Sequence, residues 1–173
     1  MEPDYLPEYC SRPTLVLGCG NILLGDDGFG PEVIAYLQAH YPAPKDVALV
    51  DAGTGVVDIL FDIALSDSKP QRLILVDTME SGQPPGTLSL LPLEQIQGKK
   101  LRTYSQHHIP TSNLLRELGE LSGVEVSALV VEPEEVPQEI QPGLSPVVRQ
   151  AVPKAGGLIA ARFFGGYERP IAQ

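Results

Sequence analysis

Residues 15–30 read Leu-Val-Leu-Gly-Cys-Gly-Asn-Ile-Leu-Leu-Gly-Asp-Asp-Gly-Phe-Gly, and the rest of the chain is organised around this stretch. Its first three residues form a short apolar run, which is typical of a strand that is covered on both faces. The glycines that follow allow backbone conformations that residues with a Cβ adopt rarely. From Phe29 onward the apolar residues recur at helical spacing. We therefore predict a strand over 14–19, a glycine-rich turn carrying Asp26 and Asp27, and a helix that ends near His40.

The order of strand and acid recurs twice farther along the chain, and a helix predicted over about 55–65 separates the two strands. A predicted strand over 47–50 is followed by Asp51, and a predicted strand over 72–76 is followed directly by Asp77. Strands that alternate with helices indicate a parallel sheet in an α/β domain. Because open α/β sheets bind ligands at the carboxyl ends of their strands, the acids are expected at a ligand-binding edge.

The second half of the chain predicts two more strands and two helices. Residues 87–91 alternate well enough for an edge strand, which can be antiparallel, and 125–131 reads as the last strand. A helix is expected from Thr111 to about Leu121. Another begins with Ser145 as its cap and Pro146 in its first position, and Pro153 is expected to kink or interrupt it. We expect a single domain over 1–173, with loose termini at 1–13 and 165–173.

Composition excludes several classes of partner. The chain has 173 residues and a formal net charge of −10, which disfavours nucleic acids and anionic membrane surfaces. No apolar run approaches the ~20 residues of a membrane helix, and the acidic N-terminus does not resemble a secretory signal. The two cysteines form no disulfide framework, so a cytoplasmic location is expected.

The glycine-rich turn resembles a phosphate-binding turn only superficially. A dinucleotide fingerprint requires a third glycine where this chain has Leu23. Asp26 and Asp27 would also repel a phosphate at the start of the helix. Asp26 is a good candidate for the helix N-cap, which leaves Asp27 to face the edge of the sheet. A nucleotide-binding module is therefore the least favoured alternative.

The acids and histidines are compatible with a metal site. His107 and His108 lie in a loop just before a predicted helix, whereas His40 is expected to interact with the end of its own helix. One imidazole with two carboxylates makes an open-sided site that suits Zn²⁺ or Ni²⁺. Asp51 can have a direct role, although it also fits a turn with side-chain-to-backbone hydrogen bonds. Cys19 follows a buried strand and is expected to be a packing residue.

These motifs together resemble the hydrogenase maturation peptidases, which process the large subunit of [NiFe] hydrogenases. The Gly-Asn and Asp-Asp-Gly elements of the glycine-rich turn carry most of the resemblance. It covers about residues 14–164 in order, through segments 18–31, 51–54, 75–77, 85–87, 105–110 and 143–148.

The resemblance implies a fold and a set of site residues. The fold is an α/β three-layer sandwich, with a twisted, mostly parallel five-stranded sheet and helices on both faces. The residues that recognise metal are Asp27, Asp77 and His107. His108 departs from the family pattern, and its position beside His107 leaves the choice between the two histidines open. Asp27 and Asp51 are the candidates for the catalytic general base.

The function implied is that of an endopeptidase. It removes the C-terminal extension from a nickel-loaded large-subunit precursor, and it recognises the nickel of that precursor through two carboxylates and a histidine. Another divalent ion, such as zinc, is a second candidate for the same ligands. We expect a monomer whose partner is the precursor. A non-catalytic metallochaperone or assembly factor that binds the same precursor is the main alternative.

Overall fold

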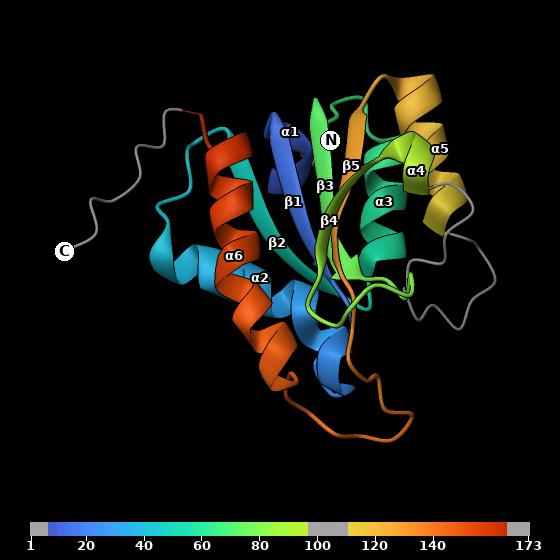
Figure 1. Cartoon of the computed structure of the whole chain (residues 1–173). Coiled ribbons are helices and arrows are strands. Elements are labelled where there is room, and N and C mark those ends of the chain that lie inside the picture. The colour runs from blue at the N-terminus through green and yellow to red at the C-terminus, as the bar shows by residue number, and fades with distance from the viewer. Residues whose placement is uncertain (1–6, 97–110, 166–173) are drawn as a thin grey trace.

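The computed structural model describes residues 7–96 and 111–165, which form a five-stranded sheet between two layers of helices (Figure 1). The strand order is β2-β1-β3-β5-β4, and only the β4–β5 pair is antiparallel. The strands are β1 (Thr14–Cys19), β2 (Val47–Gly53), β3 (Arg72–Thr78), β4 (Leu88–Pro92) and β5 (Glu125–Val131). The helices are α1 (Glu8–Ser11), α2 (Phe29–His40), α3 (Val56–Leu65), α4 (Leu93–Ile96), α5 (Thr111–Ser122) and α6 (Pro146–Phe163), with a 3₁₀ turn η1 (Gly25–Gly28).

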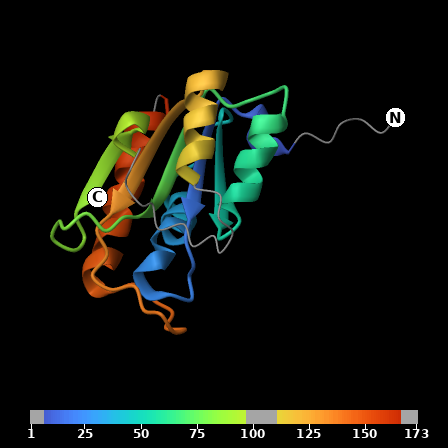
Figure 2. The ribbon, with the colours of Figure 1, turned by 90° about the vertical axis from the view of Figure 1, so that its right-hand side faces the viewer.

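Two apolar cores cover the two faces of the sheet. Alternate residues of the central strands face opposite layers, so Leu15 and Leu73 pack with α3 and α5. Val16 and Ile74 pack with α2 and α6 on the other face. Figure 2, turned by 90°, shows the sheet edge-on between the two layers. Because the central strands are buried on both sides, their sequences are continuously apolar, as predicted. The predicted fold class is confirmed.

The strand order places the site. From β1 the chain crosses to β2 on one side, and from β2 it returns past β1 to β3 on the other side. The connections leave β1 and β3 in opposite directions, which makes the carboxyl ends of these two strands the topological switch point of the sheet. Ligands of open α/β sheets bind at this point. Asp27 follows β1, and Asp77 is the second-to-last residue of β3.

Most predicted elements are observed close to their expected bounds. Strands β1 and β5 have the predicted bounds, and β4 is the predicted antiparallel edge strand. Strands β2 and β3 continue beyond the expected ends at Val50 and Val76. Backbone pairing with β1 and β5 continues past the apolar runs, so Asp51 and Asp77 lie inside strands rather than after them.

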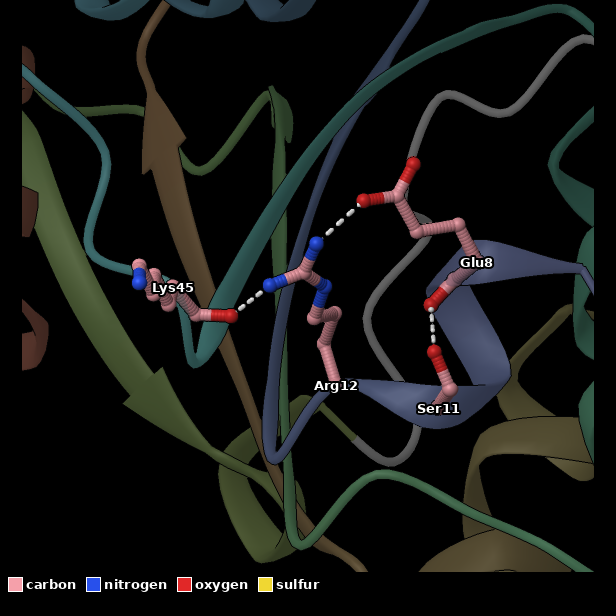
Figure 3. A network of polar contacts seen from close by, with 4 residues as sticks. All are labelled: Glu8, Ser11, Arg12 and Lys45. Atoms are coloured by element: carbon pink, nitrogen blue, oxygen red, sulfur yellow. Dashed lines mark hydrogen bonds and ion pairs between the residues drawn. The ribbon is translucent and has the colours of Figure 1, made fainter.

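The N-terminal segment differs from the predicted loose arm over 1–13. Residues 8–11 form α1, whose Cys10 is fully buried, and Tyr9 donates a hydrogen bond to Asp62 Oδ2 at 2.6 Å. Figure 3 shows Arg12 reaching both Glu8 and the carbonyl oxygen of Lys45, before β2. Cys10 and the ring of Tyr9 pack into the core beside α3. The polar composition of 1–13 as a whole did not predict this packing.

The last helix also differs in detail. α6 runs without interruption through Pro153, which is exposed, so Pro153 does not interrupt the helix, the second of the two effects predicted for it. Pro146 occupies the first position as predicted, and Ser145 occupies the cap position without a side-chain capping bond. Over the residues that the structure describes, no helix has both the length and the apolar character needed to cross a membrane. The end of the chain after 165 lies outside the described residues.

Candidate functional site at the carboxyl edge of the sheet

Close backbone packing explains the glycines of the turn. A Cβ on Gly30 would lie 2.2 Å from the carbonyl oxygen of Cys19 and 2.3 Å from that of Val76. The start of α2 therefore rests directly on the last residues of β1 and β3. At Gly20, whose φ is +129°, a Cβ would lie 1.8 Å from the carbonyl oxygen of Asp27. Because these glycines have no side chains, the turn that carries Asp27 can pack closely against the end of the sheet.

Asp27 and Asp77 form a buried pair of carboxylates at this edge. Their exposed fractions are 1% and 0%. The backbone N–H of Asn21 donates to Asp27 Oδ2 at 2.8 Å, and the backbone N–H of Thr78 donates to Asp77 Oδ1 at 2.8 Å. The Thr78 hydroxyl lies 3.3 Å from Asp27 Oδ1, so Thr78 contacts both acids. The structure thus brings together two of the predicted metal ligands.

Cys19, the last residue of β1, is affected by the charges of all three acids at this edge. Burial raises the pKa of the Cys19 thiol well above its usual range, and the charges of Asp77, Asp51 and Asp27 raise it further. Cys19 is fully buried, so it is a packing residue rather than a nucleophile, as predicted. Asp51 itself is exposed, and its Oδ1 accepts a hydrogen bond from the backbone N–H of Gly53 at 3.0 Å. The turn predicted from sequence is therefore present.

Asp26 does not cap α2, which corrects the sequence prediction. Its buried carboxylate accepts hydrogen bonds from the backbone N–H groups of Glu134 (2.9 Å), Glu135 (3.2 Å) and Ser145 (2.7 Å). It also accepts one from the Ser145 hydroxyl, at 2.9 Å. The residue at the cap position of α2 is Gly28, with no side-chain bond. Asp26 instead fastens the loop over 132–145 and the start of α6 to the turn that carries Asp27.

Glu132 and Thr78 are structural parts of this edge that the sequence analysis missed. Glu132 is 8% exposed and accepts hydrogen bonds from the Ser81 hydroxyl (2.7 Å), the Ser81 N–H (2.8 Å) and the Gly82 N–H (3.2 Å). Burial raises its pKa, but these hydrogen bonds outweigh burial, and the pKa lies below its usual range. An acid at the end of the apolar β5 repeats the pattern of Asp77, and that signal was available. Nothing in the sequence pointed to Thr78.

The histidines stand apart from this geometry. His107 and His108 lie outside the described residues. His40 interacts with its own helix, where its Nδ1 lies 3.0 Å from the Tyr36 carbonyl oxygen and its ring stacks on Tyr36. Within ranges 7–96 and 111–165, no three acid, histidine or cysteine side chains are grouped as a metal site would require. The described part of the site is the carboxylate pair.

Comparisons with known proteins identify the family to which this edge belongs. The HycI family, described as hydrogenase maturation protease, matches residues 31–162, a range that includes Asp51 and Asp77 and begins after Asp27. The hydrogenase 2 maturation protease of Escherichia coli is 32% identical over 145 residues, covering 82% of this chain and 84% of its own. The coenzyme F420 hydrogenase subunit delta of Methanothermobacter thermautotrophicus is 37% identical, covering 82% and 88%.

A solved structure agrees with these sequence relatives. The hydrogenase-maturating endopeptidase HybD from Escherichia coli superimposes with a TM-score of 0.69 at 28% identity, covering 87% of this chain and 91% of its own. The predicted family and enzyme class are thereby confirmed. This chain belongs to the hydrogenase maturation protease family.

Proposed function

We propose that this protease removes the C-terminal extension from the nickel-loaded large-subunit precursor of a [NiFe] hydrogenase. In this proposal Asp27, Asp77 and His107 share the nickel of the precursor, so nickel belongs to the substrate. Three protein ligands leave a coordination sphere incomplete, which suits a metal that a second protein also holds. Removal of the extension then lets the last segment of the precursor close over its metal.

The observation that carries the proposal is the buried carboxylate pair at the switch point. Two buried carboxylates close together are costly unless a cation or hydrogen bonds compensate for their charge. Thr78 and Asn21 donate to them, and these donors hold the carboxylates in fixed positions. Carboxylate oxygens that are already oriented can ligate a metal presented from outside without reorganising.

The direction of α5 supports His107 as the third ligand. α5 ends beside the amino end of β5, where the Val124 N–H donates to the Leu118 carbonyl oxygen, so its first residue, Thr111, points toward the carboxyl edge. His107 precedes Thr111 by four residues. Asp77 has the same parity along β3 as Leu73, which faces the α3–α5 layer. α5 thus begins on the side of the sheet where Asp77 lies.

Asp51 is the better placed of the two candidate general bases. A base must accept a proton from the attacking water, and Asp51 is exposed at the edge whereas Asp27 is buried. Asp27 also accepts hydrogen bonds through both of its oxygens. We therefore assign Asp27 to the metal of the precursor and Asp51 to the water. Nickel can additionally polarise the scissile carbonyl, as bound divalent ions do.

The first experiment separates a protease from a metallochaperone. Purified wild-type protein is mixed with nickel-loaded and with nickel-free precursor, and the mass of the precursor is followed by mass spectrometry. We expect a shortened product from the loaded precursor only. Binding without shortening would establish the metallochaperone alternative, and equal cleavage of both forms would contradict recognition of nickel.

Variants of the two histidines test the third ligand. We expect His107→Ala to abolish cleavage of the loaded precursor and His108→Ala to have a milder effect, because the family pattern places the ligand at 107. Circular dichroism controls for folding. Normal cleavage by His107→Ala refutes the assignment, and an equal loss in both variants overturns the choice between them.

Three further properties belong to this proposal. The chain acts as a monomer in the cytoplasm, in keeping with its two cysteines that form no disulfide framework. The nickel at its site is supplied by the precursor, and Zn²⁺ is a second ion that suits the same ligands. Metal analysis of the purified protein, with and without added zinc, checks the last point, and sedimentation of the purified chain checks the first.

A further inference from the structure

Three large apolar side chains are exposed beside the carboxylate pair. Ile22 is 55% exposed, Leu23 44% and Ile140 76%. Ile22 and Leu23 belong to the glycine-rich turn after β1, and Ile140 belongs to the loop over 132–145 before α6. Figures 1 and 2 both show this orange loop projecting at the same end of the molecule as the start of α2. We call these three residues the apolar ridge.

Backbone pairing holds the two parts of the ridge together. Leu24 and Gln141 form a parallel bridge, in which the Gln141 N–H donates to the Leu23 carbonyl oxygen at 2.8 Å. The Gly25 N–H donates to the Gln141 carbonyl oxygen, also at 2.8 Å. Leu23 and Ile140 each precede a residue of the bridge, so they are neighbours across the two segments. The ridge is thus a paired surface and not two independent loop tips.

The carboxylate of Asp26 anchors the same junction from inside. Its hydrogen bonds to residues 134, 135 and 145 bind the loop on both sides of Ile140. The ridge also continues into the site, because the N–H of Asn21, beside Ile22, donates to Asp27 Oδ2. A partner that covers the ridge therefore reaches the residues next to Asp27. Its position relative to the carboxylates is fixed by the fold.

The loop that carries Ile140 is acidic, and the nearest cation in the sequence, Arg149 of α6, donates to the Leu144 carbonyl oxygen at the far end of this loop. Glu134, Glu135 and Glu139 are exposed on the same loop. Neither segment that builds the ridge contains a cation, since residues 13–44 and 117–148 have no lysine or arginine. Exposed apolar side chains next to a cluster of acids mark an interaction surface that favours a partner segment with basic residues.

We propose that the apolar ridge is the docking surface for the hydrogenase large-subunit precursor, and that it binds an apolar segment of the precursor flanked by lysine or arginine. The inference rests on the proposed function, because it assigns the partner of that site. The apolar side chains supply affinity, and the acids of the loop orient the approaching segment. Docking beside Asn21 brings the metal of the precursor to Asp27 and Asp77.

The test uses apolar-to-acid variants with a matched control. Leu23→Asp and Ile140→Asp place a charge in the ridge, and Leu65→Asp does the same at an 83% exposed leucine at the end of α3, on the opposite edge of the sheet. Cleavage of nickel-loaded precursor is measured over a range of precursor concentrations. We expect KM to rise about tenfold or more in both ridge variants, with kcat within about twofold of wild type. Leu65→Asp is expected to match the wild type.

Charge reversal tests the acids of the loop independently. Glu139→Lys is expected to raise KM severalfold, and more at low salt than at high salt. Asp67→Lys reverses the charge of an exposed acid between α3 and the amino end of β3, and it is expected to leave KM unchanged. An effect of Glu139→Lys that equals that of Asp67→Lys would show that only net charge matters, which contradicts the proposal.

The outcomes separate the docking surface from the proposed function. If the wild type cleaves and the ridge variants keep its KM, the docking surface is wrong and the function stands. If the wild type binds the precursor without cutting it, the proposed protease activity on that precursor is wrong, whereas loss of this binding in Ile140→Asp still supports the surface. A wild-type dimer that Ile140→Asp converts to a monomer would show that the ridge joins two copies of this chain, which overturns the proposal.

Discussion

Asp26 and Asp27 are adjacent in the chain, and the short turn η1 directs their carboxylates to different partners. Asp26 binds backbone donors of the 132–145 loop, and Asp27 faces Thr78 at the end of β3. Both are buried, so burial alone does not distinguish a structural acid from a candidate ligand. The surroundings of the two acids distinguish them. Asp26 accepts hydrogen bonds that join two segments of the chain, whereas Asp27 lies beside a second carboxylate, that of Asp77.

The role of Asp26 predicts a large loss of stability on a small change. Asp26→Asn replaces one carboxylate oxygen by an NH₂ group that faces N–H donors, which leaves buried donors without acceptors. We expect the free energy of unfolding, measured with urea, to fall by about 2–4 kcal/mol. Asp51→Asn is the control and is expected to change it by less than about 0.5 kcal/mol, because Asp51 is exposed and asparagine can still accept from Gly53. Equal small effects would show that the Asp26 contacts do not hold the loop.

The pKa of Glu132 predicts a pH-dependent contribution to stability. Because this pKa is lower in the folded chain than in the unfolded chain, the stabilisation is present above the unfolded value and is lost as pH falls through the folded value. Glu132→Gln is expected to lose about 1–2 kcal/mol at neutral pH, and the difference from wild type should shrink as the pH falls below the ordinary pKa of a glutamate and Glu132 becomes protonated in the folded chain. Urea unfolding at several pH values measures it. Glu94→Gln, at an exposed acid of α4, should show no such trend.

At the scale of elements, the start of α2 is the part that makes the site possible. Gly30 allows the start of α2 to pack against the carbonyl oxygens of Cys19 in β1 and Val76 in β3. This close packing fixes the position of Asp27, three residues earlier, relative to the ends of the two strands. The glycines that resembled a phosphate-binding turn therefore serve packing. The turn before α2 carries the carboxylates of Asp26 and Asp27 where a dinucleotide-binding turn would hold a phosphate, which is consistent with the missing third glycine.

Gly30→Ala tests this packing directly. The added Cβ would meet two backbone oxygens that cannot rotate away, so we expect a loss of at least about 3 kcal/mol in the free energy of unfolding. Gly157→Ala in α6 is a matched control, since its Cβ would find only the Tyr41 hydroxyl at 3.6 Å. That variant is expected to gain about 0.5–1 kcal/mol. Similar stability in the two variants would refute the close approach.

The elements themselves followed from periodicity, whereas the contacts between them did not. Continuous apolar runs located β1 and β3, and Pro146 located the start of α6, because these signals are local. The partner of Asp26 lies more than a hundred residues away, at Ser145, and a good N-cap residue type suggested the nearer role. Pairing with neighbouring strands also extends β2 and β3 past their apolar runs. Asp51 and Asp77 therefore lie inside these strands, whereas the apolar runs alone predicted that they follow the strands.

At the scale of the whole molecule, the strand order gathers Asp27, Asp51 and Asp77 at one switch point. Asp27 follows β1, whereas Asp51 and Asp77 lie near the carboxyl ends of β2 and β3, and sequence order alone predicted their common edge because parallel strands share a carboxyl end. Their distances from one another depend on the packing of α2 and on the extension of β3, which no local pattern encodes. His107 and His108 lie outside the described residues, so the third ligand stays a prediction.

The cores predict the reactivity of both cysteines. Cys10 and Cys19 are fully buried, and burial raises the pKa of each thiol. We expect neither to react with a thiol reagent such as DTNB in the native protein at pH 8, and both to react in denaturant. Rapid labelling of one thiol in the native state would show that its part of the core opens. Mass analysis of the labelled peptides identifies which cysteine reacted.

The most direct test of the central claim is the affinity of Asp77→Asn for the precursor with and without nickel. Asparagine keeps the volume of Asp77 but loses the charge that would bind a cation. We expect the Kd for nickel-loaded precursor to rise at least about tenfold, the Kd for nickel-free precursor to stay unchanged, and cleavage to be lost. A folded Asp77→Asn protein that binds and cleaves the loaded precursor as the wild type does would contradict the account.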